Sequence, residues 1–154
     1  MTGTKPAPVT LYGSSISYFT GKMETYFRVR GIAYRNQAMN RALMTRAERE
    51  TGVMQLPSVE LADGRWMTDT TRMIQWFEQA VPANPLIPRD PLQRFFSLLL
   101  EDYADEWLWR PAMHFRWYQD DSAHIRSRHL ASELTRDVPL PAGLKRWFMR
   151  QRQR

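Results

Sequence analysis

The sequence predicts an α/β domain followed by an all-helical region, and three observations support this division. Residues 9–81 alternate strand-like and helix-like runs in the order βαβ(α)ββα. Prolines then recur at every third position from Pro82 to Pro91, a spacing typical of an extended connector. Beyond them, apolar residues at helical spacing give residues 92–107 one broad apolar face. The expected α/β domain, linker and helical region are residues 1–81, 82–90 and 91–154.

Length and composition limit the class of protein. A chain of 154 residues with 43% hydrophobic residues can bury a core, and no apolar run approaches the roughly 20 residues that span a bilayer. The N-terminal sequence MTGTKPAPVTLYG lacks the apolar core of a secretory signal. We therefore expect a cytoplasmic protein without membrane contact. The absence of cysteine excludes disulfides, thiolate metal sites and a cysteine nucleophile.

The net charge of +6 is unevenly distributed. Five basic residues near the C-terminus account for most of it: Lys145, Arg146, Arg150, Arg152 and Arg154. Nucleic-acid-binding proteins usually spread such charge over a folded face, whereas this charge lies at a chain end. We therefore do not expect a nucleic acid partner.

The first 36 residues contain a strand, loop, helix and strand. Val9–Tyr12 is strand-like, and residues 13–17 form a polar loop. Apolar residues at three- and four-residue spacing then predict a helix over Phe19–Arg30, which Gly31 ends. Residues 32–36 follow as a second strand.

The next segment completes a mixed four-stranded sheet. Residues 45–48 have the spacing of a capping box, which predicts the start of a short second helix that ends at Gly52. Two strand-like runs at 58–61 and 65–68 are joined by an Asp-Gly pair, which indicates an antiparallel hairpin. Asp69 is a candidate N-cap for a third helix that extends to Val81.

The segment LYGSSISYFTGKMETYFRVRGIAYR resembles the opening strand, active-site loop and first helix of the glutathione S-transferase family. That family joins a thioredoxin-like domain to an all-helical domain. The resemblance implies a protein that binds glutathione and activates its thiol for attack on a small electrophile. It places Ser17 on the catalytic serine or cysteine position. The segment LLLEDYADEWLWRPAMHFRW further resembles a bacterial subgroup of transferase-like proteins.

Two more motifs carry the same resemblance. Gln55-Leu56-Pro57 matches the family's hallmark cis-proline, which leaves the backbone at Leu56 free to pair with the cysteinyl unit of glutathione. Asp69-Thr70 falls where the family has Glu-Ser or Gln-Ser, which binds the γ-glutamyl end. The resemblance therefore implies a glutathione site formed by Leu56, Pro57, Asp69 and Thr70 beside Ser17.

The chemistry of Ser17 follows from the acidity of a thiol. A free thiol with a pKa of about 8.5 is mostly protonated at neutral pH. Lowering that pKa by about two units takes roughly 2.7 kcal/mol, which one charge-assisted hydrogen bond plus a helix N-terminus supplies. Alternatively, Ser17 serves only as a helix cap, and Tyr18 or Tyr12 supplies the hydroxyl. Asp69 is likewise a candidate helix cap, a role that can coexist with binding the γ-glutamyl ammonium group.

No metal is expected, because His114, His124 and His129 lack the spacing of a zinc site. Four acidic residues form a patch on the long predicted helix: Glu101, Asp102, Asp105 and Glu106. We expect them to pair with Arg94, Arg110 or Arg116 along that helix. The alternative is that this acidic face contributes to a pocket between the domains or to a dimer interface.

The helical region is shorter than is normal for the family, so we expect a partial helical domain. The family's electrophile site lies largely in that domain, which makes catalysis less secure than glutathione binding. An apolar face without enough partners favours self-association, and we expect a homodimer. The alternative function is a non-catalytic interaction module that binds a protein partner through its aromatic helical surface.

Overall fold

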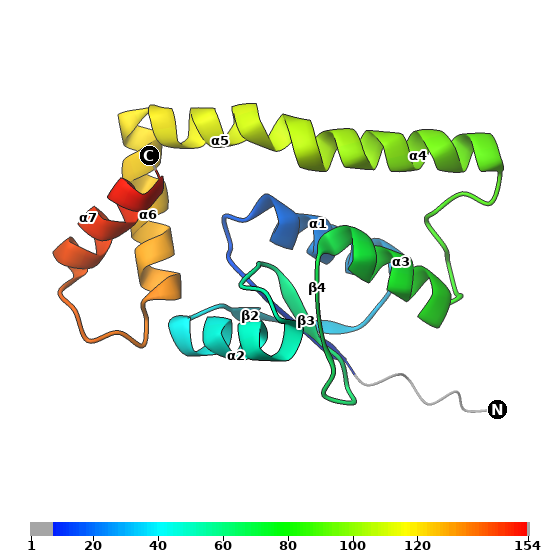
Figure 1. Cartoon of the computed structure of the whole chain (residues 1–154), viewed down its shortest axis with the longest axis horizontal. Coiled ribbons are helices and arrows are strands. Elements are labelled where there is room, and N and C mark those ends of the chain that lie inside the picture. The colour runs from blue at the N-terminus through cyan, green and yellow to red at the C-terminus, as the bar shows by residue number, and fades with distance from the viewer. Residues whose placement is uncertain (1–7, 154) are drawn as a thin grey trace.

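A computed structural model describes residues 8–153 and shows a four-stranded sheet with helices on both faces (Figure 1). The strands are β1 (Val9–Gly13), β2 (Tyr34–Ala38), β3 (Ser58–Glu60) and β4 (Trp66–Thr68). They lie in the order β2-β1-β3-β4, with β1 and β2 parallel and the other pairs antiparallel. The helices of this domain are α1 (Tyr18–Arg30), α2 (Arg41–Thr51) and α3 (Thr70–Ala80).

The core lies mainly between the sheet and the layer of α1 and α3. Leu11 and Val59 of the sheet pack there against Phe27 and Phe77, and all four are at most 2% exposed. Successive side chains of a strand point to opposite faces, so Tyr12 lies on the other face, in a smaller cluster with α2. The three helices therefore enclose the sheet from both sides.

Two predicted element boundaries are wrong. The second strand begins at Tyr34, two residues later than expected. Helix α2 begins at Arg41, because the side chain of Asn40 accepts a hydrogen bond from the Leu43 amide at 2.8 Å. Thr45 is therefore no cap; its hydroxyl donates to the Arg41 carbonyl inside the helix.

A buried ion pair between Arg30 and Glu78 fixes the start of the segment that follows the α/β domain. The buried guanidinium of Arg30 pairs with Glu78 and donates to the carbonyls of Val81 and Ala83. The Glu78 carboxylate also accepts from the backbone amides of Leu86 and Ile87, which lie within the proline-rich segment. This segment contains no helix or strand between α3 and α4 among the described residues.

The remaining described residues form a helical layer over one side of the domain and across one end (Figure 1). Helix α4 (Pro91–Tyr103), a π-helical turn η1 (Ala104–Leu108) and α5 (Trp109–Tyr118) run end to end. Pro111 has no N–H for the carbonyl four residues before it, and the wider π turn lies just ahead of it. Helices α6 (Asp120–Leu134) and α7 (Ala142–Gln153) form a pair at the far end.

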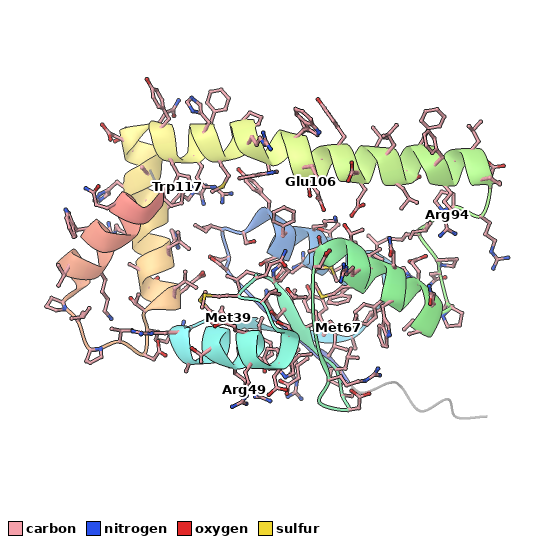
Figure 2. All side chains as sticks on the ribbon, viewed as in Figure 1. Met39, Arg49, Met67, Arg94, Glu106 and Trp117 are labelled. Atoms are coloured by element: carbon pink, nitrogen blue, oxygen red, sulfur yellow. The ribbon has the colours of Figure 1, made fainter. Side chains whose placement is uncertain are left out.

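The outer face of α4 and η1 has no covering element among the described residues. Its large apolar side chains are between 48% and 65% exposed: Leu92, Phe95, Phe96, Leu99, Leu100, Tyr103 and Trp107. Figure 2 shows side chains along the outer side of this helical rod pointing away from the rest of the protein. None of the described helices combines the length and apolarity needed to cross a membrane.

Replacing Glu78 with alanine tests the buried pair. The variant leaves the Arg30 guanidinium buried without its counter-charge and removes the acceptor for the Leu86 and Ile87 amides. We expect a loss of about 3 kcal/mol in the free energy of unfolding, measured by urea denaturation. The control is Glu50→Ala, which breaks an exposed pair with Arg49 and should cost less than about 1 kcal/mol. An equal loss of unfolding free energy in the two variants would show that the buried pair stabilises the protein no more than the exposed pair does.

The same carboxylate predicts an acid sensitivity. Burial alone would raise the pKa of Glu78, but hydrogen bonds from the Ile87 amide, the Tyr26 hydroxyl and the Leu86 amide bring the pKa below its ordinary value of 4.5. This contribution to stability is present above pH 4.5 and is lost as the pH falls through the lowered pKa. Glu78→Gln should therefore lose less stability than the wild type between pH 6 and pH 3, in denaturation series spanning about that range. Parallel pH profiles would contradict this assignment.

Candidate functional site

Sheet topology brings the predicted site residues to one end of the molecule. Strands β1, β2 and β4 run in the same direction, and each is followed by a helix. The N-termini of α1, α2 and α3 therefore meet at the carboxyl ends of these strands. Pro57 joins them, because β3 runs the other way and starts at that end. This is the end that the helical layer covers.

A small hydrogen-bonded loop presents Ser17 at the start of α1. The Ser17 amide donates to the Ser14 carbonyl at 3.0 Å, and the Ser17 hydroxyl oxygen accepts from the Thr20 amide at 3.3 Å. The Thr20 hydroxyl in turn accepts a hydrogen bond from the Ser14 amide, which closes the loop. A side chain at Gly13 would lie 2.3 Å from the Thr20 hydroxyl, so only glycine fits there. Ser17 is thus a helix cap, and its hydroxyl proton has no acceptor among the described residues.

The two tyrosines proposed as alternatives lie in different surroundings. The Tyr12 hydroxyl donates to Glu60 at 2.6 Å, and its ring stacks on Trp66 at 4.7 Å. Burial, together with the hydrogen bond to Glu60, raises the pKa of Tyr12 to about 12. Tyr18 is 49% exposed, and the guanidinium of Arg116 lies 3.9 Å from its ring centroid. Tyr12 faces α2, whereas Tyr18 lies at the start of α1.

The Leu56–Pro57 peptide bond is cis, as the family resemblance implied. Pro57 is fully buried, and its carbonyl accepts from the Thr68 hydroxyl at 3.1 Å, which ties the start of β3 to the end of β4. In the part of the chain that the structure describes, the backbone amide and carbonyl of Leu56 have no hydrogen-bond partner. Leu56 therefore offers an unpaired donor and acceptor at this end of the sheet.

Asp69 and Thr70 form the start of α3. Asp69 has a left-handed backbone (φ 70°), which is uncommon for a residue other than glycine. Its carboxylate accepts from the amides of Thr71 and Arg72 at 3.1 and 3.3 Å and so caps the helix. Thr70 is buried, and its hydroxyl lies 3.5 Å from the Asp105 carboxylate of η1.

The acidic patch contacts the α/β domain, so the expected pairing along its own helix is wrong for the described ion pairs. Lys22 of α1 binds both Glu101 and Asp105. The Thr71 hydroxyl also donates to Glu101. The alternative prediction was that this acidic face contributes to a pocket between the domains or to a dimer interface, and of these residues Asp105 lines a cavity between α1 and the helical layer.

Two further carboxylates, which sequence reasoning missed, bind the same end of the domain. Glu133 of α6 accepts from the Ser14 hydroxyl at 2.6 Å and from the Ser15 amide at 3.2 Å. Asp137 accepts from the amides of Ala42 and Arg41 at the start of α2. The hydrogen bond from the Ala42 amide, more than any other cause, holds the pKa of Asp137 below its ordinary value. Their partners are more than 90 residues away, so no local sequence signal marks them.

A cavity of about 200 Å³ lies between the start of α1 and the helical rod. Its walls are Tyr18, Phe19, Lys22, Ala104, Asp105, Leu108, Trp109 and Ala112. Aromatic and aliphatic side chains therefore dominate it, with one ion pair at its edge. The sequence predicted a pocket between the domains only as an alternative, and its aromatic wall includes Trp109.

The described residues hold no group of three or more His, Cys, Asp or Glu side chains that could bind a metal ion. The three histidines are exposed. Arg154, and with it part of the predicted basic tail, lies outside the described residues, as does most of the N-terminal segment without a signal-like core.

Comparison with protein families decides the assignment of the N-terminal part. Residues 11–85 match the family model for the glutathione S-transferase N-terminal domain. These residues belong to the glutathione S-transferase family. The matched segment contains Ser17, Pro57 and Thr70, so all three lie within the part of the chain that matches the family's N-terminal domain. The domain has the family's thioredoxin-like fold, and a helical region follows it.

Solved glutathione transferases share the fold. An Omega-class enzyme from Trametes versicolor is 18% identical with a TM-score of 0.62, and the alignment covers 82% of this chain and 57% of that protein. A rice enzyme solved with glutathione is 17% identical with a TM-score of 0.60, and the alignment covers 82% of this chain and 60% of the rice protein. A glutathione transferase homologue from Burkholderia with bound glutathione is 14% identical with a TM-score of 0.55, and the alignment covers 82% of this chain and 65% of that protein. The chain thus spans less than two thirds of each of these relatives. Curated proteins gave no significant match.

Replacing Glu133 with alanine tests its hold on the Ser17 loop. The change leaves the Ser14 hydroxyl and Ser15 amide without their charged acceptor, and we expect a loss of about 2 kcal/mol in unfolding free energy. Hydrogen exchange at Ser15 should also become faster. The control, Glu106→Ala, removes an exposed carboxylate of the same helical layer and should change stability by less than about 0.5 kcal/mol. Unchanged exchange at Ser15 would contradict this role.

Proposed function

We propose that the protein binds glutathione between the Ser17 loop, Leu56-Pro57 and Asp69-Thr70, and that Ser17 stabilises the glutathione thiolate. The observation that carries this proposal is the convergence of three elements on one end of the sheet: an N-capping serine with a free hydroxyl proton, an unpaired backbone at Leu56, and the N-terminus of α3. The solved relatives from Burkholderia and rice contain glutathione, which supports the same ligand here.

Each part of the site matches one part of the tripeptide. The Leu56 amide and carbonyl pair with the backbone of the cysteinyl unit. The γ-glutamyl carboxylate binds at the N-terminus of α3 beside the Thr70 hydroxyl, because backbone N–H groups and the helix dipole attract an anion. The ammonium group of the same unit lies toward the carboxylates of Asp69 and Asp105. Pro57 keeps Leu56 in place through its contact with Thr68.

The thiol then lies at the start of α1. The Ser17 hydroxyl donates its proton to the sulfur, and the helix N-terminus adds positive potential, so both lower the thiol pKa. The thiolate attacks an electrophilic carbon, forming a carbon–sulfur bond, while a leaving group departs with its electron pair or a double bond accepts the pair and then a proton. The cavity beside Tyr18 and Trp109 holds the electrophile. The cytoplasm, which keeps thiols reduced, suits this chemistry.

Ser17→Ala tests the role of the hydroxyl. Calorimetry should show that wild type and variant both bind glutathione, whereas the ultraviolet absorbance of the bound thiolate should titrate about one to two pH units higher in the variant. Ser17→Thr keeps a hydroxyl and should restore the lower value. Tyr12→Phe should not change the titration, since the Tyr12 hydroxyl already donates to Glu60. A shift with Tyr12→Phe or Tyr18→Phe, and none with Ser17→Ala, would move the role to that tyrosine.

The exposed face of α4 favours a second candidate function. The seven large apolar side chains of this face are each about half exposed or more, which exceeds what a monomer normally presents to water. We expect a second copy of the chain to cover this face, giving a homodimer. If another protein covers it instead, the chain is a non-catalytic interaction module that retains glutathione binding without turnover.

Sedimentation velocity distinguishes these states. We expect a dimer for the wild type and a monomer for Leu99→Arg, which places a charge in the centre of the apolar face. Arg49→Glu on the opposite side of the domain is the control and should leave the dimer intact. A monodisperse wild-type monomer would contradict the dimer and favour a different partner.

A further inference from the structure

The α6–α7 pair carries basic side chains that neither the fold nor the proposed glutathione site uses. Positions 125, 128, 129 and 132 recur at helical spacing and therefore share one face of α6, and position 136, in the turn after α6, lines the same cavity as positions 128 and 132. They are Ile125, Arg128, His129, Ser132 and Arg136. Arg128 and Arg136 are cationic, and His129 can become cationic by binding a proton.

The acidic residues of the same segment face the other way. Glu133 binds the Ser17 loop, and Asp137 binds the start of α2. In the described part of the chain, Arg128 and Arg136 form no ion pair with a carboxylate. The charges of this segment are therefore segregated, with the acidic groups committed to the domain contact and the basic groups left without counter-charges.

These basic groups surround a hollow rather than a flat surface. A cavity of about 290 Å³ between α6 and α7 is lined by Arg128, Ala131, Ser132, Arg136, Leu140, Ala142 and Lys145. A second cavity of about 340 Å³ shares Arg128 and Ser132 with it and adds Ile125 and His129. The Lys145 ammonium is held in place by the Thr135 carbonyl at 2.7 Å. None of the described side chains that line these two cavities is a carboxylate.

This arrangement has a physical cost and a chemical use. Cations gathered without counter-charges repel one another, and the repulsion disappears when an anion binds among them. Planar guanidinium groups bind phosphate oxygens through paired hydrogen bonds, and the Ser132 hydroxyl offers another donor. The apolar floor of Ala131, Leu140 and Ala142 suits the carbon part of such a ligand.

We propose that this groove binds a small phosphate-bearing ligand, with Arg128 and Arg136 contacting the phosphate and Lys145 adding charge. The site lies on α6 and α7 and does not depend on glutathione binding. The groove takes one phosphate or diphosphate group together with a short organic body, as its volume requires.

Calorimetric titration of the full chain with inorganic pyrophosphate tests the proposal. We expect saturable binding, with an affinity that falls about tenfold in Arg128→Gln and in Arg136→Gln, since a hydrogen bond to a charged group is worth that factor or more. Arg49→Gln removes the same charge from exposed α2 and should change the affinity less than about twofold. Circular dichroism confirms that each variant folds.

The outcomes separate this site from general attraction to anions. Absence of saturable binding to the wild type would overturn the proposal, and so would an equal loss in Arg49→Gln. Two further arms use phosphatidylglycerol vesicles, with phosphatidylcholine vesicles as the reference, and a single-stranded oligonucleotide. Binding to either of these without binding to pyrophosphate would show a macromolecular surface and not a small-ligand groove.

Discussion

Carboxylates placed against helix N-termini hold the two parts of this protein together. Backbone N–H groups at a helix start lack intrahelical acceptors and carry partial positive charge. Here the starts of α1, α2 and α3 lie at one end of the sheet. Asp137 accepts from the first amides of α2, Glu133 accepts from the Ser15 amide in the loop before α1, and Asp105 lies 3.5 Å from the Thr70 hydroxyl at the start of α3. Lys22 adds a charged contact to the same layer. Ile16 of the loop before α1 also packs in an apolar cluster with Trp117, Ala123 and Leu130. The relative position of the two parts thus depends on polar contacts of defined geometry together with this apolar cluster.

This interface also determines where a ligand can bind. Glutathione is an anionic peptide with one ammonium group, and the helix N-termini of the α/β domain supply the positive potential for its carboxylates. Because Glu133 accepts from the Ser15 amide, the thiol in the proposed site would face the Ser17 hydroxyl and the start of α1. The aromatic cavity beside Tyr18 lies on the other side of the same position. The proposed glutathione site and this cavity are adjacent because the helical layer docks there.

The sequence predicted β1, β3, β4, α1 and α3 well because their signals are local, whereas β2 begins two residues later than predicted. Gly31 ends α1 and Asp69 caps α3, as the residue types indicated. Helix α2 was placed too late, since Thr45 and Glu48 have capping-box spacing but Asn40 provides the cap. The role of Glu133 depends on a contact across more than 100 residues, which no periodicity reveals. The partners of Glu101 and Asp105 were missed for the same reason. Ser17, Pro57 and Thr70 came from family resemblance, and their functional roles stay predictions.

The central claim is that three separate segments form one glutathione site. The most direct measurement is a titration of isotope-labelled protein with reduced glutathione, followed by amide chemical shifts. The account predicts saturable changes at the start of α1, at Leu56 and at the start of α3, all with one dissociation constant. Changes confined to another surface, such as the α6–α7 groove, or no changes at all, would contradict it.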